Sequence, residues 1–182
     1  PETVRISVNL SPVQFRGRGL AAVVRNALAA ACLAPNRLEL EITEAVLLRN
    51  DDATIATLHE LRGLGIRIAM DDFGVGYSSL SYLRSFPFDK IKIDRSFIAD
   101  LGRNRDNAAI IRAVADLGAS LAIETTAEGV ETPEQLATIR HCGCTEVQGY
   151  LISQPRTAEA TLAFIRDHAD GIRPDHPLFH LA

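Results

Sequence analysis

The chain has 182 residues, 47% of them hydrophobic, and a formal net charge of −4 at pH 7. This length and composition predict one globular domain with a sizeable core. The acidic balance disfavours a protein that wraps nucleic-acid polymers, although it allows one small anionic ligand. No apolar run approaches the roughly 20 residues of a membrane-spanning helix, and no cysteines show paired CxxC spacing. We therefore expect a cytoplasmic domain, or the cytoplasmic part of a larger membrane-anchored parent, with structural or incidental cysteines.

Six short β-type segments recur along the chain, and a segment with helical periodicity follows each. The predicted strands are 4–10, 37–43, 66–72, 89–94, 121–129 and 146–152.

Helix start and stop signals are clearest after the second and the fifth strands. Asp51 or Asp52 can cap the first of these helices and Gly65 can end it, whereas Thr132 and Pro133 open the second. The apolar stripes predicted to face the core are Ile55, Leu58 and Leu61; Ile110, Ile111, Val114 and Leu117; and Leu136 with Ile139.

Strict alternation of strands and helices predicts parallel strands, in an open doubly wound sheet or in a closed barrel. The strands carry one apolar and one charged face: Leu40 and Ile42 oppose Glu39 and Glu41, for example. A charged face suits the lumen of a barrel better than a sheet that helices cover on both sides. We therefore predict an α/β fold of the (β/α)8 TIM-like type with about six of its eight βα units present.

Residues 1–168 are predicted to form this partial domain, and residues 169–182 a tail or linker. The chain starts at Pro1, without a methionine and just before a strand, as expected if the first two strands were cut away. Because two strand edges would then be unpaired, we expect the chain alone to be less stable and weakly active or inactive.

Polar residues stand near the C-terminal ends of all six predicted strands, where barrel enzymes place their functional groups. Any one of them alone would be interpreted as a solvated turn or a helix cap, but a set with a member in every strand is not expected by chance. The set consists of Asn9, Glu41, Asp71 with Asp72, Lys92, Glu128 and Gln148.

Carboxylate and amide oxygens without histidine or thiolate suit Mg²⁺ or Mn²⁺ better than zinc, and the five histidines lie elsewhere in the sequence. Adjacent Asp71 and Asp72 repel each other unless cations hold both ionised. On an extended strand they point in different directions, so Asp71 could bridge two ions while Asp72 reaches one. Such a pair of ions suits phosphodiester hydrolysis. Lys92 could orient the attacking water, or only pair with Asp94 or a strand glutamate.

Six motifs in this order resemble the EAL domain family of bacterial phosphodiesterases, which hydrolyse cyclic di-GMP to linear pGpG. They run from the first strand to about residue 155 and comprise NLS (9–11), ELEITE (39–44), DDFGVGYSSL (71–80), KIDRSF (92–97), AEGVET (127–132) and QGYLIS (148–153).

The resemblance implies two Mg²⁺ or Mn²⁺ ions as cofactors and roles for eight residues. Lys92 would act on the attacking water, Gln148 would complete the water network, and Glu44 would hold the loop that follows Asp72, whose Gly74 and Gly76 permit a mobile backbone. The implied metal ligands are Asn9, Glu41, Asp71, Asp72 and Glu128. Its implied partners are cyclic di-GMP, a second copy through the same loop, and sensory or GGDEF domains in the parent protein.

The sequence also departs from the family pattern. The Glu-Ala-Leu motif would lie upstream of Pro1, and with it one metal-binding glutamate and one phosphate-binding arginine. Val75 replaces the usual loop threonine, and Thr145 stands where aspartate is common. A non-catalytic module that binds cyclic di-GMP or a partner protein therefore remains an alternative. Another Mg²⁺-dependent barrel, such as an aldolase or an enolase-like enzyme, fits the lumen but not the motifs.

Overall fold

A computed structural model describes residues 4–16, 19–47, 52–76, 83, 86–101 and 105–167. The predicted tail, the end of the DDFGVGYSSL loop, Asp51, and three of the histidines (His168, His176 and His180) lie outside the described residues. The other two histidines, His59 and His141, are on exposed helical positions, as expected.

All six predicted strands are present and form one parallel sheet in the order β1-β2-β3-β4-β5-β6. The strands are β1 (Ile6–Leu10), β2 (Leu38–Thr43), β3 (Arg67–Phe73), β4 (Lys90–Ile93), β5 (Glu124–Glu128) and β6 (Glu146–Gln148). The helices are α1 (Leu20–Ala30), α2 (Glu44–Leu47), α3 (Asp52–Gly63), α5 (Arg95–Ala99), α6 (Arg105–Leu121), α7 (Pro133–Cys142) and α8 (Ala158–Asp167), with short 3-10 helices η1 (Gln14–Arg16) and η2 (Pro35–Arg37).

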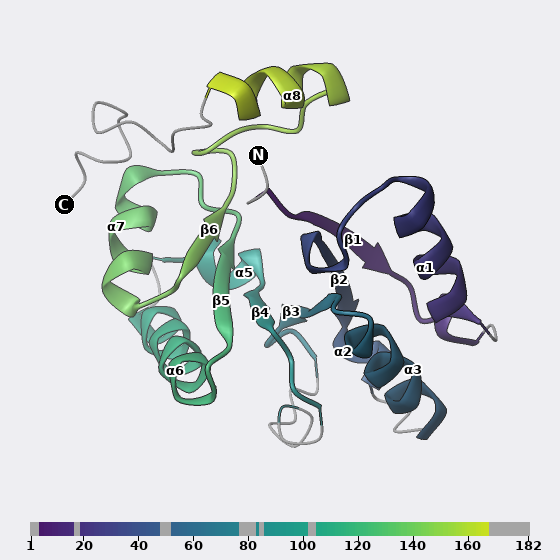
Figure 1. The fold of residues 1–182 in the computed structure, drawn as a ribbon. Coiled ribbons are helices and arrows are strands. Elements are labelled where there is room, and N and C mark those ends of the chain that lie inside the picture. The colour runs from purple at the N-terminus through teal and green to yellow at the C-terminus, as the bar shows by residue number, and fades with distance from the viewer. Residues whose placement is uncertain are drawn as a thin grey trace.

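The sheet curves into half of a barrel, with α1 and α3 outside one end and α6 and α7 outside the other (Figure 1). Its curvature brings distant strands together across the concave side. The Arg5 guanidinium, just before β1, lies 2.9 Å from the Glu146 carboxylate on β6. The predicted partial (β/α) barrel is therefore confirmed.

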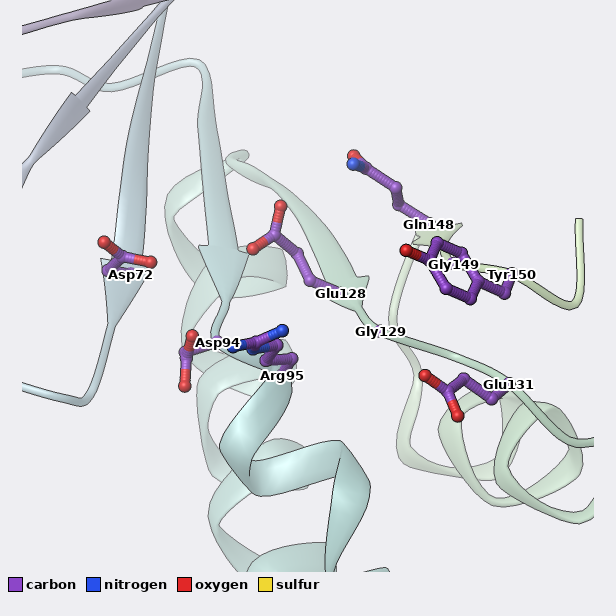
Figure 2. A pocket seen from close by; sticks show the side chains of 9 residues that line it. All are labelled: Asp72, Asp94, Arg95, Glu128, Gly129, Glu131, Gln148, Gly149 and Tyr150. Carbon is purple, nitrogen blue, oxygen red and sulfur yellow. The ribbon is translucent and has the colours of Figure 1, made fainter. Parts of the chain in front are cut away.

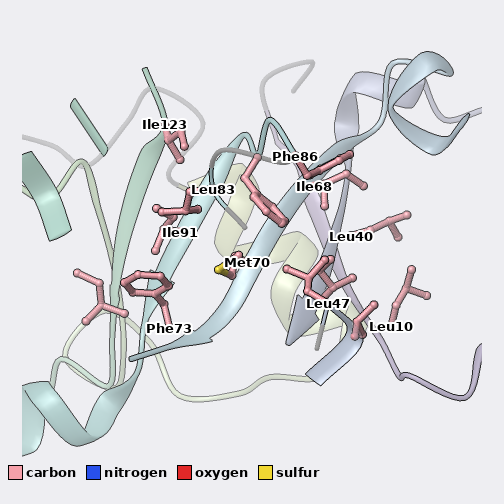
Figure 3. Close-up of a cluster of buried hydrophobic side chains, with 14 of the residues drawn as sticks. Leu10, Leu40, Leu47, Ile68, Met70, Phe73, Leu83, Phe86, Ile91 and Ile123 are labelled. Atoms are coloured by element: carbon pink, nitrogen blue, oxygen red, sulfur yellow. The ribbon is translucent and has the colours of Figure 1, made fainter. Parts of the chain in front are cut away.

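The apolar and charged strand faces segregate as the sequence predicts. Ile42, Ile68 and Ile91 are fully buried under the helices on the convex side and belong to one hydrophobic cluster. Figure 3 shows Ile68 and Ile91 in this cluster. The charged faces of the same strands line the concave side. Burying the apolar face supplies the main stabilisation, at about 25 cal/mol per Å² of apolar surface.

The predicted helix signals explain where α7 begins. The Thr132 hydroxyl accepts a hydrogen bond from the Gln135 amide at 3.2 Å, and the Gln135 side chain accepts one from the Thr132 amide at 3.1 Å. This capping box satisfies two backbone donors that the helix leaves free, and Pro133 follows at the first helical position. Leu136 and Ile139 are buried, as predicted.

Three local predictions are wrong. Ile110 is 41% exposed and does not belong to the buried stripe of α6, since Ile111 and Val114 already face the core. Helix α6 extends through Leu121, so β5 begins only at Glu124. Strand β6 ends at Gln148 because the chain turns at Gly149, which leaves 149–152 outside the sheet.

No helix in the described ranges is both long enough and apolar enough to cross a bilayer. Of the three free cysteines, Cys32 is exposed, Cys144 partly buried and Cys142 buried.

Candidate active site

We call the concave side of the half-barrel the trough. The parallel registers place the predicted site residues at one end of it, here called the mouth. Asn9 pairs with Glu41 in register, and Glu128 pairs with Gln148. Asp71 is level with Thr43, two residues beyond Glu41 on β2. Because all six strands run the same way, their C-terminal ends meet at the same edge, where barrel enzymes bind their ligands.

Lys92 on β4 lies at the centre of this group and is 5% exposed. Its ammonium nitrogen is 2.7 Å from Glu41 Oε2, 3.0 Å from Asp71 Oδ1 and 2.6 Å from Glu128 Oε1. Of the two pairings predicted for Lys92, the one with strand glutamates is present. The pairing with Asp94 is not, because the Asp94 carboxylate accepts a hydrogen bond from the Ser96 amide and caps α5.

The two adjacent aspartates do not diverge as an extended strand would require. The register between β3 and β4 shifts between Met70 and Phe73, and Asp72 has a φ of 54°. Aspartate is one of the few residue types that tolerate this left-handed conformation. One ligand oxygen each from Asp71, Asp72 and Glu128 lies within 4.8 Å of the others. The expected divergence is therefore wrong, because a bulge redirects the strand at this point.

The pKa values of Asp72, Glu128 and Lys92 are shifted by burial and by the charged groups close to them. Burial raises the pKa of Asp72, and the charge of Asp71 raises it further. Burial also raises the pKa of Glu128, and the opposing effect of Lys92 only partly compensates. Burial lowers the pKa of Lys92, but its hydrogen bonds to Glu128, Glu41 and Asp71 outweigh this effect and raise the pKa overall.

We name Glu41, Asp71, Asp72, Lys92 and Glu128 the mouth layer, since the structure brings these five predicted residues together. Asn9 and Gln148 flank the layer on β1 and β6, and both side chains are exposed. All seven predicted strand-end residues thus lie along one edge of the sheet, but only five form a cluster.

Glu44 supports the loop that leaves β3, as expected. It is 5% exposed, and its carboxylate accepts a hydrogen bond from the Gly74 amide at 3.3 Å. A Cβ atom on Gly76 would come within 2.6 Å of Glu44 Oε2, and one on Gly74 would come within 2.8 Å of the Phe97 ring. Gly74 also has a φ of 99°. The two glycines thus permit close approach of the loop to Glu44 and Phe97. The contact with Phe97 is not predicted from the sequence.

A cavity of about 360 Å³ adjoins the mouth layer. Figure 2 shows Asp72 on one side of it, Gln148 and Tyr150 on the other, and Glu128 with Arg95 between them. Its lining also contains four charged or aromatic side chains for which the sequence predicts no ligand role: Asp94, Arg95, Glu131 and Tyr150. Each lies within one of the six EAL-like motifs, and this membership is the signal that the sequence offers for it.

A second layer of charged side chains lies nearer the N-terminal ends of the strands. Lys90 Nζ lies 2.9 Å from Glu39 Oε1 and 2.7 Å from Glu146 Oε2, and the Arg67 guanidinium lies 2.6 Å from Glu124 Oε2. Glu39 is 1% exposed. We name this set the basal layer; it comprises Arg5, Glu39, Arg67, Lys90, Glu124 and Glu146.

The mouth layer fits a divalent cation by its donor chemistry. Asp71, Asp72 and Glu128 supply hard oxygen ligands in close proximity, and no histidine or thiol of the described residues joins this group. Four carboxylates and one ammonium also leave an excess of negative charge among the described residues of this layer. Such an excess favours cations taken from solution.

The fold and the site together define a parallel α/β barrel protein with an acidic, oxygen-rich centre at its strand ends. The family model described as "EAL domain" matches residues 1–155. The chain therefore belongs to the EAL domain family.

Solved and curated relatives agree with this assignment. The structure described as "PaMucR Phosphodiesterase, c-di-GMP complex" is 44% identical, superposes with a TM-score of 0.82, and is matched over 86% of this chain and 64% of its own. The manganese/cy-diGMP complex of BlrP1 from Klebsiella pneumoniae is 34% identical with a TM-score of 0.77, over 81% of this chain and 38% of its own.

The cyclic di-GMP phosphodiesterase NbdA of Pseudomonas aeruginosa is 45% identical over 91% of this chain and 21% of its own length. The chain spans about a fifth of the length of the curated relatives that it matches. BlrP1 has also been solved as a calcium/cy-diGMP complex, so this relative has been crystallised with the ligand and either of two divalent cations.

Proposed function

We propose that this chain carries the metal-binding and catalytic residues of a cyclic di-GMP phosphodiesterase, whose product is linear pGpG. The observation that carries the proposal is the convergence of Glu41, Asp71, Asp72 and Glu128 around Lys92 in a chain of the EAL family. Relatives whose names include this activity or this ligand support the proposal.

Asn9, Glu41, Asp71, Asp72 and Glu128 would hold two Mg²⁺ or Mn²⁺ ions. Bound there, divalent ions lower the pKa of a water and neutralise charge on the phosphodiester. The bulge at Asp72 supports this assignment, because it turns the second carboxylate toward the first.

Lys92 and Gln148 would orient the reactants. The three donors of the buried Lys92 ammonium contact Glu41, Asp71 and Glu128. When ions engage those carboxylates, a released donor would point to a water or a phosphate oxygen from a fixed position on β4. Gln148 lines the adjoining cavity and can complete the water network there. Glu44 would keep the loop after β3 in place through its hydrogen bond to Gly74.

Single-turnover hydrolysis tests the proposal, because an excess of chain over substrate detects even slow conversion. With Mn²⁺ or Mg²⁺, chromatography should show cyclic di-GMP converted to pGpG, and EDTA should abolish the conversion. Asp71→Asn should lower the rate by about a hundredfold or more, since it removes a charge from the ligand set. An active Asp71→Asn variant would contradict the mechanism. Because the chain alone is expected to be weakly active, tight binding of cyclic di-GMP without turnover would favour the non-catalytic module only if it persists in a longer protein that also carries the Glu-Ala-Leu motif.

A further inference from the structure

The cavity beside the mouth layer has an uneven charge pattern. Asp72, Asp94, Glu128 and Glu131 supply four carboxylates to its wall, whereas Arg95 is the one cation among the described residues that line it. Metal ligation at the mouth layer gives Arg95 no role. A separate function for this side chain therefore needs to be considered.

The Cα and Cβ atoms of Arg95 are held in place by packing. It is the first residue of α5, directly after the capping Asp94, and it lies against the end of β5. A Cβ atom on Gly129 would come within 2.6 Å of Arg95 Cβ, so only glycine allows this approach. Gly129 has a φ of 72°, which further favours glycine. The start of the Arg95 side chain is thereby held at a defined place on the cavity wall.

The guanidinium of Arg95 forms no ion pair with a carboxylate in the described part of the chain, although four carboxylates share its cavity. The neighbouring Asp94 carboxylate accepts a hydrogen bond from the Ser96 amide at 2.9 Å, and it interacts with the charge of Arg95 without forming a salt bridge. Elsewhere in the trough, Arg5 and Arg67 are paired with glutamates. Arg95 thus differs from both of them in presenting its donors to the cavity (Figure 2).

Other parts of the cavity lining suit a flat, aromatic ligand group. Backbone atoms of Gly129 and Gly149 form part of the lining, and a side chain on Gly149 would collide with the backbone of Val130. Tyr150 stands at the rim with 59% of its surface exposed. An exposed aromatic ring beside a glycine-lined wall can stack against a nucleobase.

We propose that Arg95 is a specificity residue that donates hydrogen bonds to the O6 and N7 atoms of a guanine base held in this cavity. The inference rests on the proposed function, because the mouth layer would hold a phosphodiester and so place an attached base in the adjoining space. Guanine presents two acceptors on this edge, which match the paired donors of an arginine. Adenine presents an amino donor in place of O6 and mismatches the guanidinium.

The test compares affinities for cyclic di-GMP and cyclic di-AMP by calorimetry in Ca²⁺, a cation with which a relative has been crystallised together with cy-diGMP. Arg95→Ala should weaken binding of cyclic di-GMP roughly tenfold to a hundredfold and that of cyclic di-AMP less than about threefold. Arg95→Lys keeps the charge but loses the paired donors, so it should also lose guanine preference. Arg25→Ala is the matched control, since Arg25 is exposed and pairs with Glu60 on the outer helices.

Each outcome decides the inference. Equal weakening of both dinucleotides by Arg95→Ala would overturn it in favour of a phosphate contact, and unchanged affinities would overturn it outright. If Arg95→Ala does not fold, as judged by circular dichroism, the Arg95→Lys comparison decides alone. Failure of the unsubstituted chain to bind either dinucleotide would overturn the proposed function together with this inference. Binding that is guanine-selective in all variants would overturn only the inference.

Discussion

The basal and mouth layers lie in the same trough, one above the other, and share strands. Glu39 and Glu41 are two residues apart on β2, as are Lys90 and Lys92 on β4. The basal layer balances three cations, Arg5, Arg67 and Lys90, with three glutamates. In the mouth layer, the described residues set one ammonium against four carboxylates.

This difference teaches that buried charge has two uses within one fold. A balanced, hydrogen-bonded set needs nothing from solution and fixes the strands relative to each other. An unbalanced set is costly unless cations or protons enter. Two glutamates illustrate the contrast. Burial raises the pKa of Glu146, but Lys90, Thr126 and Arg5 together outweigh this effect and lower the pKa overall. The pKa of Glu128 stays raised by burial.

Glu39→Gln breaks the balance of the basal layer and should have the largest effect. Glu39 is 1% exposed, and its carboxylate contacts Lys90 at 2.9 Å and Arg67 at 3.3 Å. Removing this charge leaves Lys90 and Arg67 with only the partly exposed Glu146 and Glu124 as partners and should cost about 3 kcal/mol of unfolding free energy. Urea titration measures the loss, with Glu60→Gln as the control, because the Glu60 pair with Arg25 is exposed. Equal stabilities of the two variants would refute the structural role of the basal layer.

Glu41→Gln makes the same change two residues further along β2, in the mouth layer. It should leave stability intact and reduce activity, the opposite of a purely structural effect. It relieves an excess of negative charge, so the unfolding free energy without metal should stay unchanged or rise. Single-turnover hydrolysis of cyclic di-GMP should fall by about a hundredfold, since a proposed metal ligand is lost. A Glu41→Gln variant that is active but unstable would contradict the metal-binding role of the mouth layer and indicate a structural role instead.

Gly74→Ala tests whether the mouth layer depends on its adjoining loop. Its φ of 99° and the approach of a Cβ atom to within 2.8 Å of the Phe97 ring predict a loss of about 1–2 kcal/mol in thermal unfolding. Gly63→Ala is the control, because nothing lies within 4 Å of its added Cβ atom near the end of α3. A loss of equal size in the control would show that the effect is not specific to the loop.

Glu146→Gln should have the smallest effect, visible as a pH dependence. Because the folded-state pKa of Glu146 is lowered, its ionised form stabilises the fold above the unfolded pKa. That contribution is lost as the pH falls through the folded pKa. The variant should therefore be less stable near pH 7, by less than about 1 kcal/mol for this partly exposed group, and the difference should vanish once the pH is below the folded pKa. A difference that grows on acidification would contradict the lowered pKa.

The sequence predicts the strand faces well because alternation is a local property. Glu39 with Glu41 and Lys90 with Lys92 identify the lumen side without any knowledge of the partners. The direction of Asp72 is not predictable in this way. It depends on a bulge set by the pairing of β3 with β4, and no neighbouring residue signals it.

The basal layer also escapes sequence analysis. Arg5, Arg67 and Glu124 stand near strand starts, where charged residues are usually solvated, and only the parallel register and the curvature bring them together. Arg95 lies in the KIDRSF motif, but its place on the cavity wall follows from a contact between α5 and the end of β5.

Calorimetric titration with Mn²⁺ tests most directly whether the mouth layer is the divalent-cation centre. The chain should bind Mn²⁺ saturably, Glu124→Gln in the basal layer should bind it with the same affinity, and Asp71→Asn should lose the binding. Equal Mn²⁺ affinity in the unsubstituted chain and in Asp71→Asn would contradict the account.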